Sequence, residues 1–186
     1  MAADEELVKI IKEGNIEAFS ELIDRFENKI YRLAVGYTGN SSDAEDITQE
    51  VFIKIYNNIK NYMLESSFST WVYRITANTC KSFLKRRKII GFISLDWLYD
   101  SRQHKVPVEP AGFEKDVENR ETLDKFYSAL AVLPDKYKDV LVLREIEELD
   151  YQQIAGVTGL SIGTVKSRLS RAKEKIRVKL RRQGEI

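Results

Sequence analysis

A group of short polar and basic side chains near the C-terminus has the residue types and spacing that contact DNA. Its members are Thr164, Lys166, Ser167, Arg168 and Arg171. Arginine and lysine donate to guanine edges and phosphates, while hydroxyl groups bond to either. On a helix these residues oppose an apolar stripe with spacings of three and four residues, made of Ile162, Val165, Leu169, Ala172, Ile176 and Leu180. A buried stripe behind a short basic face suits a helix that enters a major groove.

The residues just before this helix predict a helix-turn-helix over 149–173. Asp150 is placed to cap a first helix, and Gln153 three residues later completes a capping box. Gly159 supplies the positive φ at which such a helix ends, and Ser161 caps the next helix. The plainer alternative is an amphipathic surface helix with a solvated charged side. The two caps and the short turn favour DNA contact.

A second basic row lies on a helix predicted over residues 71–87. Arg74, Asn78, Lys81 and Lys85 follow one another at spacings of four, three and four, which keeps them on one side. An asparagine amide both donates to and accepts from a base edge, whereas lysine mainly binds phosphates. The row therefore indicates nucleic-acid binding, and a solvated lysine face is the alternative.

Four aromatic residues interleaved with serine and threonine come just before and within the start of that helix. They are Tyr62, Phe68, Trp71 and Tyr73, and we expect residues 62–70 to form a polar loop. Aromatic faces beside cations hold unstacked bases of single strands. Some of these rings must serve the core, and packing is the first assignment for Tyr73 and Trp71.

A helix predicted over residues 42–58, with Ser42 as its cap, has an acidic face. The exposed arc holds Asp43, Asp46, Gln49, Glu50 and Asn57 around a central Ile53, and Tyr56 is expected in the buried arc. An apolar residue framed by acids and amides is typical of a protein-binding surface. A singly exposed isoleucine is also ordinary, so both interpretations stay open.

Charge is segregated along the chain although the net charge is only +1. Residues 1–60 hold 12 acidic and 7 basic side chains, and residues 114–160 hold 11 and 6. Residues 61–88 hold 6 basic and 1 acidic side chain, and residues 161–186 hold 9 and 2. Nucleic acid attracts the basic blocks, and the acidic blocks suit a basic protein surface.

Composition disfavours an enzyme and a membrane protein. Cys80 and His104 are single, so we expect no disulfide within the chain, no metal and no cofactor. A nuclease that used Asp43, Glu45, Asp46 and Glu50 would have its acids on one exposed helix face, without a second carboxylate cluster. The acidic N-terminus without an apolar run predicts no signal peptide, and no segment approaches the roughly 18 consecutive apolar residues of a membrane span. We expect a soluble, cytoplasmic protein that does not insert into membranes.

The chain of 186 residues is predicted to be all-α, with two small helical domains joined by a linker. The domains are expected at 1–88 and 114–186, the second containing a helix over 136–147 capped by Asp135. Residues 89–113 hold prolines and glycines without a sustained period and are the expected linker. Its first part, 89–98, is more apolar than a free tether and is expected to dock on a surface.

Four segments together resemble the extracytoplasmic-function class of bacterial sigma factors, in the sigma-70 family. They are residues 43–52 (DAEDITQEVF), 68–78 (FSTWVYRITAN), 133–137 (LPDKY) and 163–172 (GTVKSRLSRA). Each segment alone is weak, but all four in this order and spacing are specific. The similarity covers nearly the whole chain.

The resemblance implies a transcription initiation factor with two DNA-reading domains. Core RNA polymerase, through its beta and beta-prime subunits, would contact Asp43, Asp46, Gln49, Glu50 and Ile53. The −10 promoter element would be read and opened by Phe68, Ser69, Thr70, Trp71, Arg74, Asn78, Lys81 and Lys85. The −35 element would be read by Thr164, Lys166, Ser167, Arg168, Ser170 and Arg171. Such factors are usually held inactive by an anti-sigma factor.

A one-component regulator that dimerises on palindromic DNA is the main alternative. Its helix-turn-helix would resemble that of response regulators. The sequence lacks the α/β pattern of a phosphoacceptor domain, and the first domain has a basic row of its own. Both features favour the initiation factor.

Overall fold

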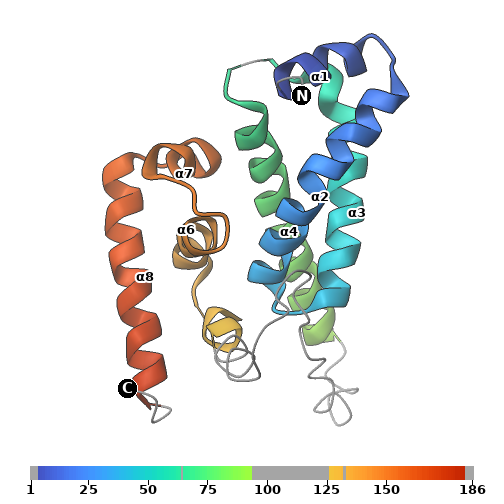
Figure 1. Ribbon diagram of the computed structural model, residues 1–186. Coiled ribbons are helices and arrows are strands. Elements are labelled where there is room, and N and C mark those ends of the chain that lie inside the picture. The colour runs from blue at the N-terminus through green and yellow to red at the C-terminus, as the bar shows by residue number, and fades with distance from the viewer. Residues whose placement is uncertain (1–3, 64, 94–125, 132, 183–186) are drawn as a thin grey trace, which may run out of the picture.

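The computed structural model describes residues 4–63, 65–93, 126–131 and 133–182, and every regular element in these ranges is helical (Figure 1). The first part contains α1 (Asp4–Lys12), α2 (Ile16–Thr38), α3 (Ser41–Asn58), the 3-10 turn η1 (Ile59–Asn61) and α4 (Phe68–Ile93). The second contains helical residues 126–131, α6 (Asp135–Glu145), α7 (Tyr151–Thr158) and α8 (Ile162–Arg182). The predicted all-α fold is confirmed.

In the N-terminal bundle, α2, α3 and α4 pack on one another, and α1 crosses one end of α2 (Figure 1). Its core is built from apolar side chains at helical spacing on each helix. Fully buried examples are Phe26, Ile30, Leu33, Ile47, Val51, Ile55, Phe68, Val72 and Cys80. The polar faces of α3 and α4 are left outside this core.

Asparagine and glycine set the boundaries of α2 and α3. The Asn15 side chain accepts a hydrogen bond from the Ala18 N–H at 3.0 Å, which starts α2. Gly39, with φ 66°, ends it in the left-handed conformation. The predicted cap of α3 at Ser42 is wrong, because Asn40 accepts the Asp43 N–H at 2.9 Å instead.

The long helix α4 begins earlier and ends later than the sequence predicted. It starts at Phe68 rather than Trp71, since the Ser67 hydroxyl accepts the Thr70 N–H at 3.3 Å and caps the first turn. It continues to Ile93, so residues 89–93 extend the helix into the expected linker. The remainder of that linker, 94–113, with the second half of its apolar segment, lies outside the described residues.

In the C-terminal bundle, α6 and α7 both pack on α8. The predicted helix-turn-helix is confirmed. Asp150 accepts the Gln153 N–H at 2.8 Å, and Gln153 accepts the Asp150 N–H at 2.9 Å, which completes the capping box. Gly159 ends α7 with φ 72°. Buried residues of the three helices, including Leu143, Ile154, Val165, Leu169 and Ala172, form its core.

Helix α6 differs from its prediction at both ends. It begins at Asp135 itself, after Pro134, which supplies no side-chain cap, so the predicted Asp135 cap is wrong. It ends at Glu145 rather than Glu147. Because Ile146 and Glu147 lie beyond the end of the helix, the Glu147 side chain can turn toward the N-terminal bundle.

The two bundles touch each other through two helix pairs. Helix α7 packs on α4, and α6 packs on α2 (Figure 1). Of the helices in the described part of the chain, none has the length and the apolar character that a membrane span requires.

Candidate functional site

The outward face of α8 carries the polar residues that the sequence predicted. Lys166, Ser167, Ser170 and Arg171 are exposed, and Thr164 and Arg168 are half-buried. The middle of the apolar stripe beneath them is buried, from Val165 through Leu169 and Ala172 to Ile176, whereas Ile162 at its start is 41% exposed and Leu180 at its end is half-buried. The structure therefore brings all six predicted −35 residues together on one helix, which begins where Ser161 accepts the Thr164 N–H at 3.2 Å.

An aromatic residue beside this face was missed by sequence reasoning. Tyr151, at the start of α7, is 40% exposed. Lys166 Nζ lies 5.5 Å from the centre of its ring, and the Arg144 guanidinium carbon lies 5.6 Å from it. Both cations are thereby oriented by one ring. No local pattern indicates this, because the three residues come from α6, α7 and α8.

The row on α4 is also formed, but part of it is occupied. Arg74, Asn78 and Lys85 are exposed and Lys81 is half-buried. Arg74 donates to the Gly156 carbonyl of α7 at 2.6 Å, and Lys81 donates to an Asp139 carboxylate oxygen of α6 at 3.3 Å. Two of the four predicted donors are thus engaged by the C-terminal bundle.

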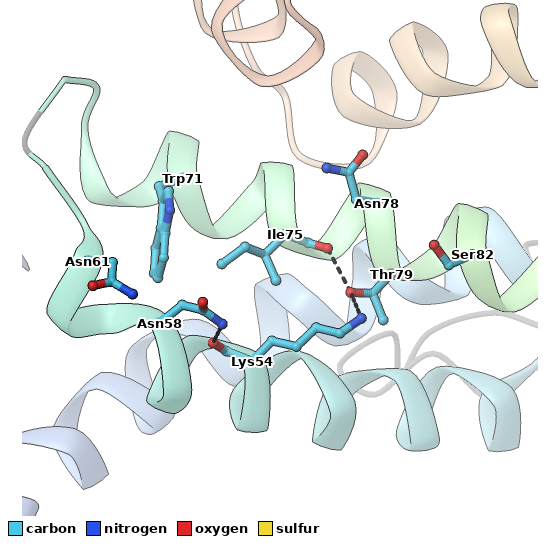
Figure 2. Close-up of a pocket in the computed structure, with 8 residues that line it drawn as sticks. All are labelled: Lys54, Asn58, Asn61, Trp71, Ile75, Asn78, Thr79 and Ser82. Atoms are coloured by element: carbon cyan, nitrogen blue, oxygen red, sulfur yellow. Dashed lines mark hydrogen bonds between the residues drawn. The ribbon is translucent and has the colours of Figure 1, made fainter.

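A groove of about 450 Å³ lies between α3 and α4 (Figure 2). It is lined by Lys54, Asn58, Asn61, Trp71, Ile75, Asn78, Thr79 and Ser82. Lys54 crosses it and donates to the Thr79 hydroxyl at 3.0 Å, and the Asn58 amide donates to the Lys54 carbonyl at 2.8 Å. A ring wall, three amides and one cation match the hydrogen-bonding edges and phosphate of a nucleotide.

Of the residues that line this groove, only Trp71 and Asn78 were predicted from the sequence as DNA-binding residues. Lys54 and Asn58 are spaced by four on α3, so they share a face, but that spacing alone does not say that the face meets α4. Asn61 enters through the turn η1. These contributions depend on helix packing and had no local signal.

The expectation that Phe68 offers a stacking surface is wrong in this conformation. Its side chain is 0% exposed, and its ring centre lies 5.5 Å from those of Phe26 and Trp71 and 5.4 Å from that of Tyr62. The reason is that Phe68 begins α4 and faces inward. Among these rings, Trp71 is half-buried and reaches the groove.

Ser69 and Thr70 belong to the first turn of α4 rather than to a loop. Both hydroxyls lie within hydrogen-bond distance of the Ser67 hydroxyl, at 3.1 and 2.9 Å. Ser69 is half-buried and Thr70 is buried. Beside them a second hollow of about 310 Å³ is lined by Asn61, Tyr62, Met63, Glu65, Ser66, Trp71 and Arg74. This hollow is formed by residues of the predicted loop together with Trp71 and Arg74 of α4.

On the acidic face of α3, some side chains form ion pairs with neighbouring cations and others are exposed to solvent. Asp43 pairs with Arg87, and Glu50 pairs with Lys54 at 2.8 Å and with Arg86 at 3.1 Å. The hydrogen bond from Lys54 lowers the pKa of Glu50, and Arg86 adds to the effect. Asp46 and Gln49 are exposed.

The apolar part of this surface is larger than predicted. Ile53 is 61% exposed, as expected, and Tyr56, which was expected in the buried arc, is 56% exposed. The Tyr56 ring packs edge-on against Phe19, with centres 5.2 Å apart, so it leans on the outside of the bundle. An apolar area bordered by Asp46 and Gln49 is suited to a protein partner.

Three ionisable side chains meet between the two bundles. Tyr73 of α4 donates to Glu147 Oε2 at 3.2 Å, and Arg32 Nε of α2 lies 3.7 Å from Glu147 Oε1. Among the described residues, this Oε1 is buried and accepts no hydrogen bond. Burial raises the pKa of Glu147 to about 7, against the opposing charge of Arg32. This cluster was not predicted, because it depends on contact between distant helices.

Cys80 is buried in the N-terminal core, as expected for a small apolar side chain, and burial raises the pKa of its thiol to about 12. His104 lies outside the described residues. Within the described ranges, no three His, Cys, Asp or Glu side chains gather in a way that would hold a metal ion.

Comparisons with known families give the same division of the chain. The Sigma-70 region 2 family matches residues 22–89, and the Sigma-70 region 4 family matches residues 123–176. The first match covers most of α2, all of α3 and most of α4, and the second covers α6, α7 and most of α8.

Similar proteins span the whole chain. The ECF RNA polymerase sigma factor SigW of Bacillus subtilis is 32% identical over 177 residues, which cover 94% of this chain and 95% of the relative. The ECF RNA polymerase sigma-E factor of Haemophilus influenzae is 34% identical over 182 residues, covering 95% of each.

Two solved structures share the fold at 22% identity. CnrH, in complex with the cytosolic domain of CnrY, has a TM-score of 0.71 and covers 96% of this chain and 97% of its own. The sigma factor RpoE from Bartonella quintana, in complex with the anti-sigma factor NepR, has a TM-score of 0.67 and covers 88% and 96%.

Proposed function

Because the chain belongs to the extracytoplasmic-function (ECF) class of RNA polymerase sigma factors, we propose that it binds core RNA polymerase and directs it to promoters by reading a −35 and a −10 element. The proposal rests on one observation: two separate helix faces, one on α8 and one on α4, carry side chains that can contact DNA. A repressor that reads duplex DNA needs only the first.

Helix α8 reads the −35 element in the major groove. Arg168 and Arg171 are the candidates for base contacts, since a guanidinium bridges guanine O6 and N7. Lys166, held against the Tyr151 ring, is the candidate phosphate contact. Thr164, Ser167 and Ser170 add short hydroxyl contacts on the same face.

Helix α4 and the groove beside it read and open the −10 element. Arg74, Lys81 and Lys85 hold the backbone, and Asn78 reads a base edge. The groove extends this site to Lys54 and Asn58 of α3. An unstacked base enters the hollow between Trp71 and residues 61–66, where stacking and hydrogen bonds offset the energy of its extrusion.

The acidic and apolar face of α3 binds the polymerase. Asp46, Gln49 and Ile53 are exposed and form its centre. Asp43 is paired with Arg87, and Glu50 with Arg86. At the edge of the face, both acids exchange these ion pairs for contacts with the polymerase. A location in the cytoplasm follows from this partner, and the RpoE relative bound to its anti-sigma factor supports control of this chain by a protein of the same kind.

The test is transcription of a genomic-fragment library by purified core polymerase with and without the chain, followed by sequencing of RNA 5′ ends. We expect new start sites that share two upstream motifs. Asn78→Ala should reduce these transcripts at least tenfold, whereas Asn28→Ala, the same change at an exposed position of α2, should not. A chain that produces no start sites but binds palindromic duplexes as a dimer would identify a one-component regulator instead.

A further inference from the structure

The turn between η1 and α4 is held from outside by the N-terminal helix α1. The Lys12 ammonium, at the end of α1, donates to the Tyr62 carbonyl at 2.6 Å and lies 5.8 Å from the centre of the Tyr62 ring. Figure 1 shows α1 beside η1, on which it packs. Helix α1 precedes residues 22–89, which match the Sigma-70 region 2 family. The contact therefore joins the matched part of the bundle to a helix outside it.

Tyr62 connects this contact to the hollow beside Trp71. Its hydroxyl donates to the Ser66 carbonyl at 2.5 Å, and its ring centre lies 5.3 Å from that of Trp71. Tyr62 is only 4% exposed, so it forms a wall of the hollow and offers no free ring face to a base. Tyr62 thus supports the hollow on two sides, at Ser66 and at Trp71.

Lys12 is itself held in place, because α1 is anchored to the bundle. Asp4, in the first turn of α1, pairs with Arg25 of α2 at 2.8 Å. The buried residues of α1 are Leu7, Val8 and Ile11. A charged donor makes a hydrogen bond about twice as strong as a neutral one. The half-buried Lys12 ammonium therefore fixes the backbone at the point where η1 ends.

We propose that Lys12 is a positioning residue for base capture: through Tyr62, it holds the hollow in the shape that receives one unstacked base of the −10 strand. This inference deepens the proposed −10 role of the hollow and rests on it. Lys12 acts on the backbone of Tyr62 from behind the wall of the hollow. Loss of its ammonium should weaken the capture of one base and leave the contacts of Asn78 and Lys85 with the strand unchanged.

Binding of the holoenzyme to a single strand tests this role. The probe is a fluorescent non-template strand of about 20 nucleotides, taken from a promoter that the start-site sequencing identifies, and anisotropy gives its affinity. A set of the same strands, each lacking the base at one position, locates the captured base. It is the position at which the missing base weakens binding by the wild-type holoenzyme most.

Lys12→Met keeps a stem of similar length and removes the charge. It should weaken binding of the intact strand about fivefold or more, which is the lower end of what one stacked base contributes. Binding of the strand that lacks the captured base should change by less than about twofold, because that strand has no base to place in the hollow. Lys12→Arg retains a donor and should keep most of the affinity.

Lys9→Met is the matched control, because it makes the same change at an exposed position of α1. It should bind both strands as the wild type does. Circular dichroism checks that each variant folds, and co-purification with core polymerase checks that the holoenzyme assembles.

Two results would overturn the role of Lys12. Equal losses on the two strands would mean that the ammonium attracts the phosphate backbone or supports the fold as a whole. A folded Lys12→Met variant that binds both strands as tightly as the wild type would mean that the hollow keeps its shape without Lys12. If Lys12→Met does not fold, Lys12→Gln replaces it, and the same two results decide.

Tyr62→Phe tests the other end of the same path, since it keeps the ring and removes only the hydroxyl that holds Ser66. It should show the same selective loss on the intact strand. A selective loss for Lys12→Met without one for Tyr62→Phe would contradict the path through Ser66.

Failure of the base-capture site itself would look different. Trp71→Leu removes the aromatic stacking face and keeps an apolar side chain. If Trp71→Leu still distinguishes the two strands as the wild type does, the base is not held in this hollow, and the proposed −10 function of the hollow fails. If Trp71→Leu loses that distinction and Lys12→Met retains it, the hollow captures the base and only the role of Lys12 is wrong.

Discussion

The −35 face on α8 and the −10 face on α4 are built from similar residues but differ in their surroundings. On α8, Lys166, Ser170 and Arg171 face solvent. On α4, Arg74 and Lys81 are held by the Gly156 carbonyl and the Asp139 carboxylate. The same chain therefore presents one open face on α8 and one face on α4 that is partly covered by α6 and α7.

This difference predicts different responses of the two faces to substitution. Substitutions on the open face should act in every state of the chain, whereas substitutions on the covered face should act only after the two bundles separate. Each prediction below tests one side of this comparison.

The largest effect is expected at the proposed polymerase face of α3, because neither DNA face can direct transcription in a chain that does not bind polymerase. Asp46→Lys combined with Ile53→Lys should reduce core binding and run-off transcription at least a hundredfold. Both positions are exposed on α3, so helicity should be unchanged. Co-purification with core polymerase measures the binding, and Glu27→Lys on an exposed part of α2 is the control. A double variant that still co-purifies would place the polymerase contact elsewhere.

The open reader should respond equally in compact and separated chains. Arg171→Ala should cost about 1–3 kcal/mol in binding to a −35 duplex and relax base choice at one or two positions. Gly36→Leu separates the bundles in this test, because even a Cβ at Gly36 would lie 2.3 Å from Ile146 Cδ1 of the other bundle. The loss should be the same in the wild type and in Gly36→Leu, because α8 is uncovered in both. Titration of duplex variants by anisotropy measures it. An equal loss on every duplex would make Arg171 a phosphate contact, and a loss confined to Gly36→Leu would show that α8 is also covered.

Region docking should weaken as pH rises, because of Glu147. Burial raises the pKa of Glu147 to about 7 in the docked chain, whereas an exposed glutamate has a pKa of about 4.3. Docking is therefore strongest below about pH 4.3 and weakens by at most about tenfold per pH unit until about pH 7. The facing groups are Arg32 and Lys29 of α2, Tyr73 of α4 and the neighbouring Glu148.

Small-angle X-ray scattering between pH 6 and 7 measures this change as an increase in the radius of gyration. Glu147→Gln is neutral at every pH and should remove the dependence. If the wild type and Glu147→Gln respond identically to pH, another group controls docking.

The open reader could be predicted from the sequence almost completely, and the covered reader could not. The capping box of Asp150 and Gln153, the Gly159 stop and the apolar stripe of α8 are local signals. The structure contains the first two, and it buries the stripe from Val165 to Ile176 but not Ile162. The row Arg74, Asn78, Lys81 and Lys85 is equally local and was also found. Lys54, Asn58 and the interface cluster at Glu147 depend on how helices pack, which helical spacing does not determine.

The errors have the same origin. Phe68 and Tyr56 were assigned from their place on a helical wheel or in a loop. Phe68 is buried because α4 begins three residues early, and Tyr56 is exposed because Phe19 offers it a site outside the bundle. Ser42 and Asp135 were equally plausible caps, but the chain turned into each helix one or two residues earlier. Local chemistry identified the elements, and tertiary packing decided which side chains they present.

The smallest effect is expected at the helix shared by both readers. Helix α7 supports α8 from one side and covers α4 from the other, and its start depends on the Asp150 capping box. Asp150→Ala should lower the free energy of unfolding by about 1 kcal/mol, because the Gln153 N–H loses its acceptor. Thermal unfolding followed by circular dichroism measures the change. Asp150 is exposed and makes its capping bonds within α7, so affinity for the −35 duplex should stay within about twofold. A loss of duplex binding well beyond this, at unchanged stability, would mean that the start of α7 itself contacts DNA.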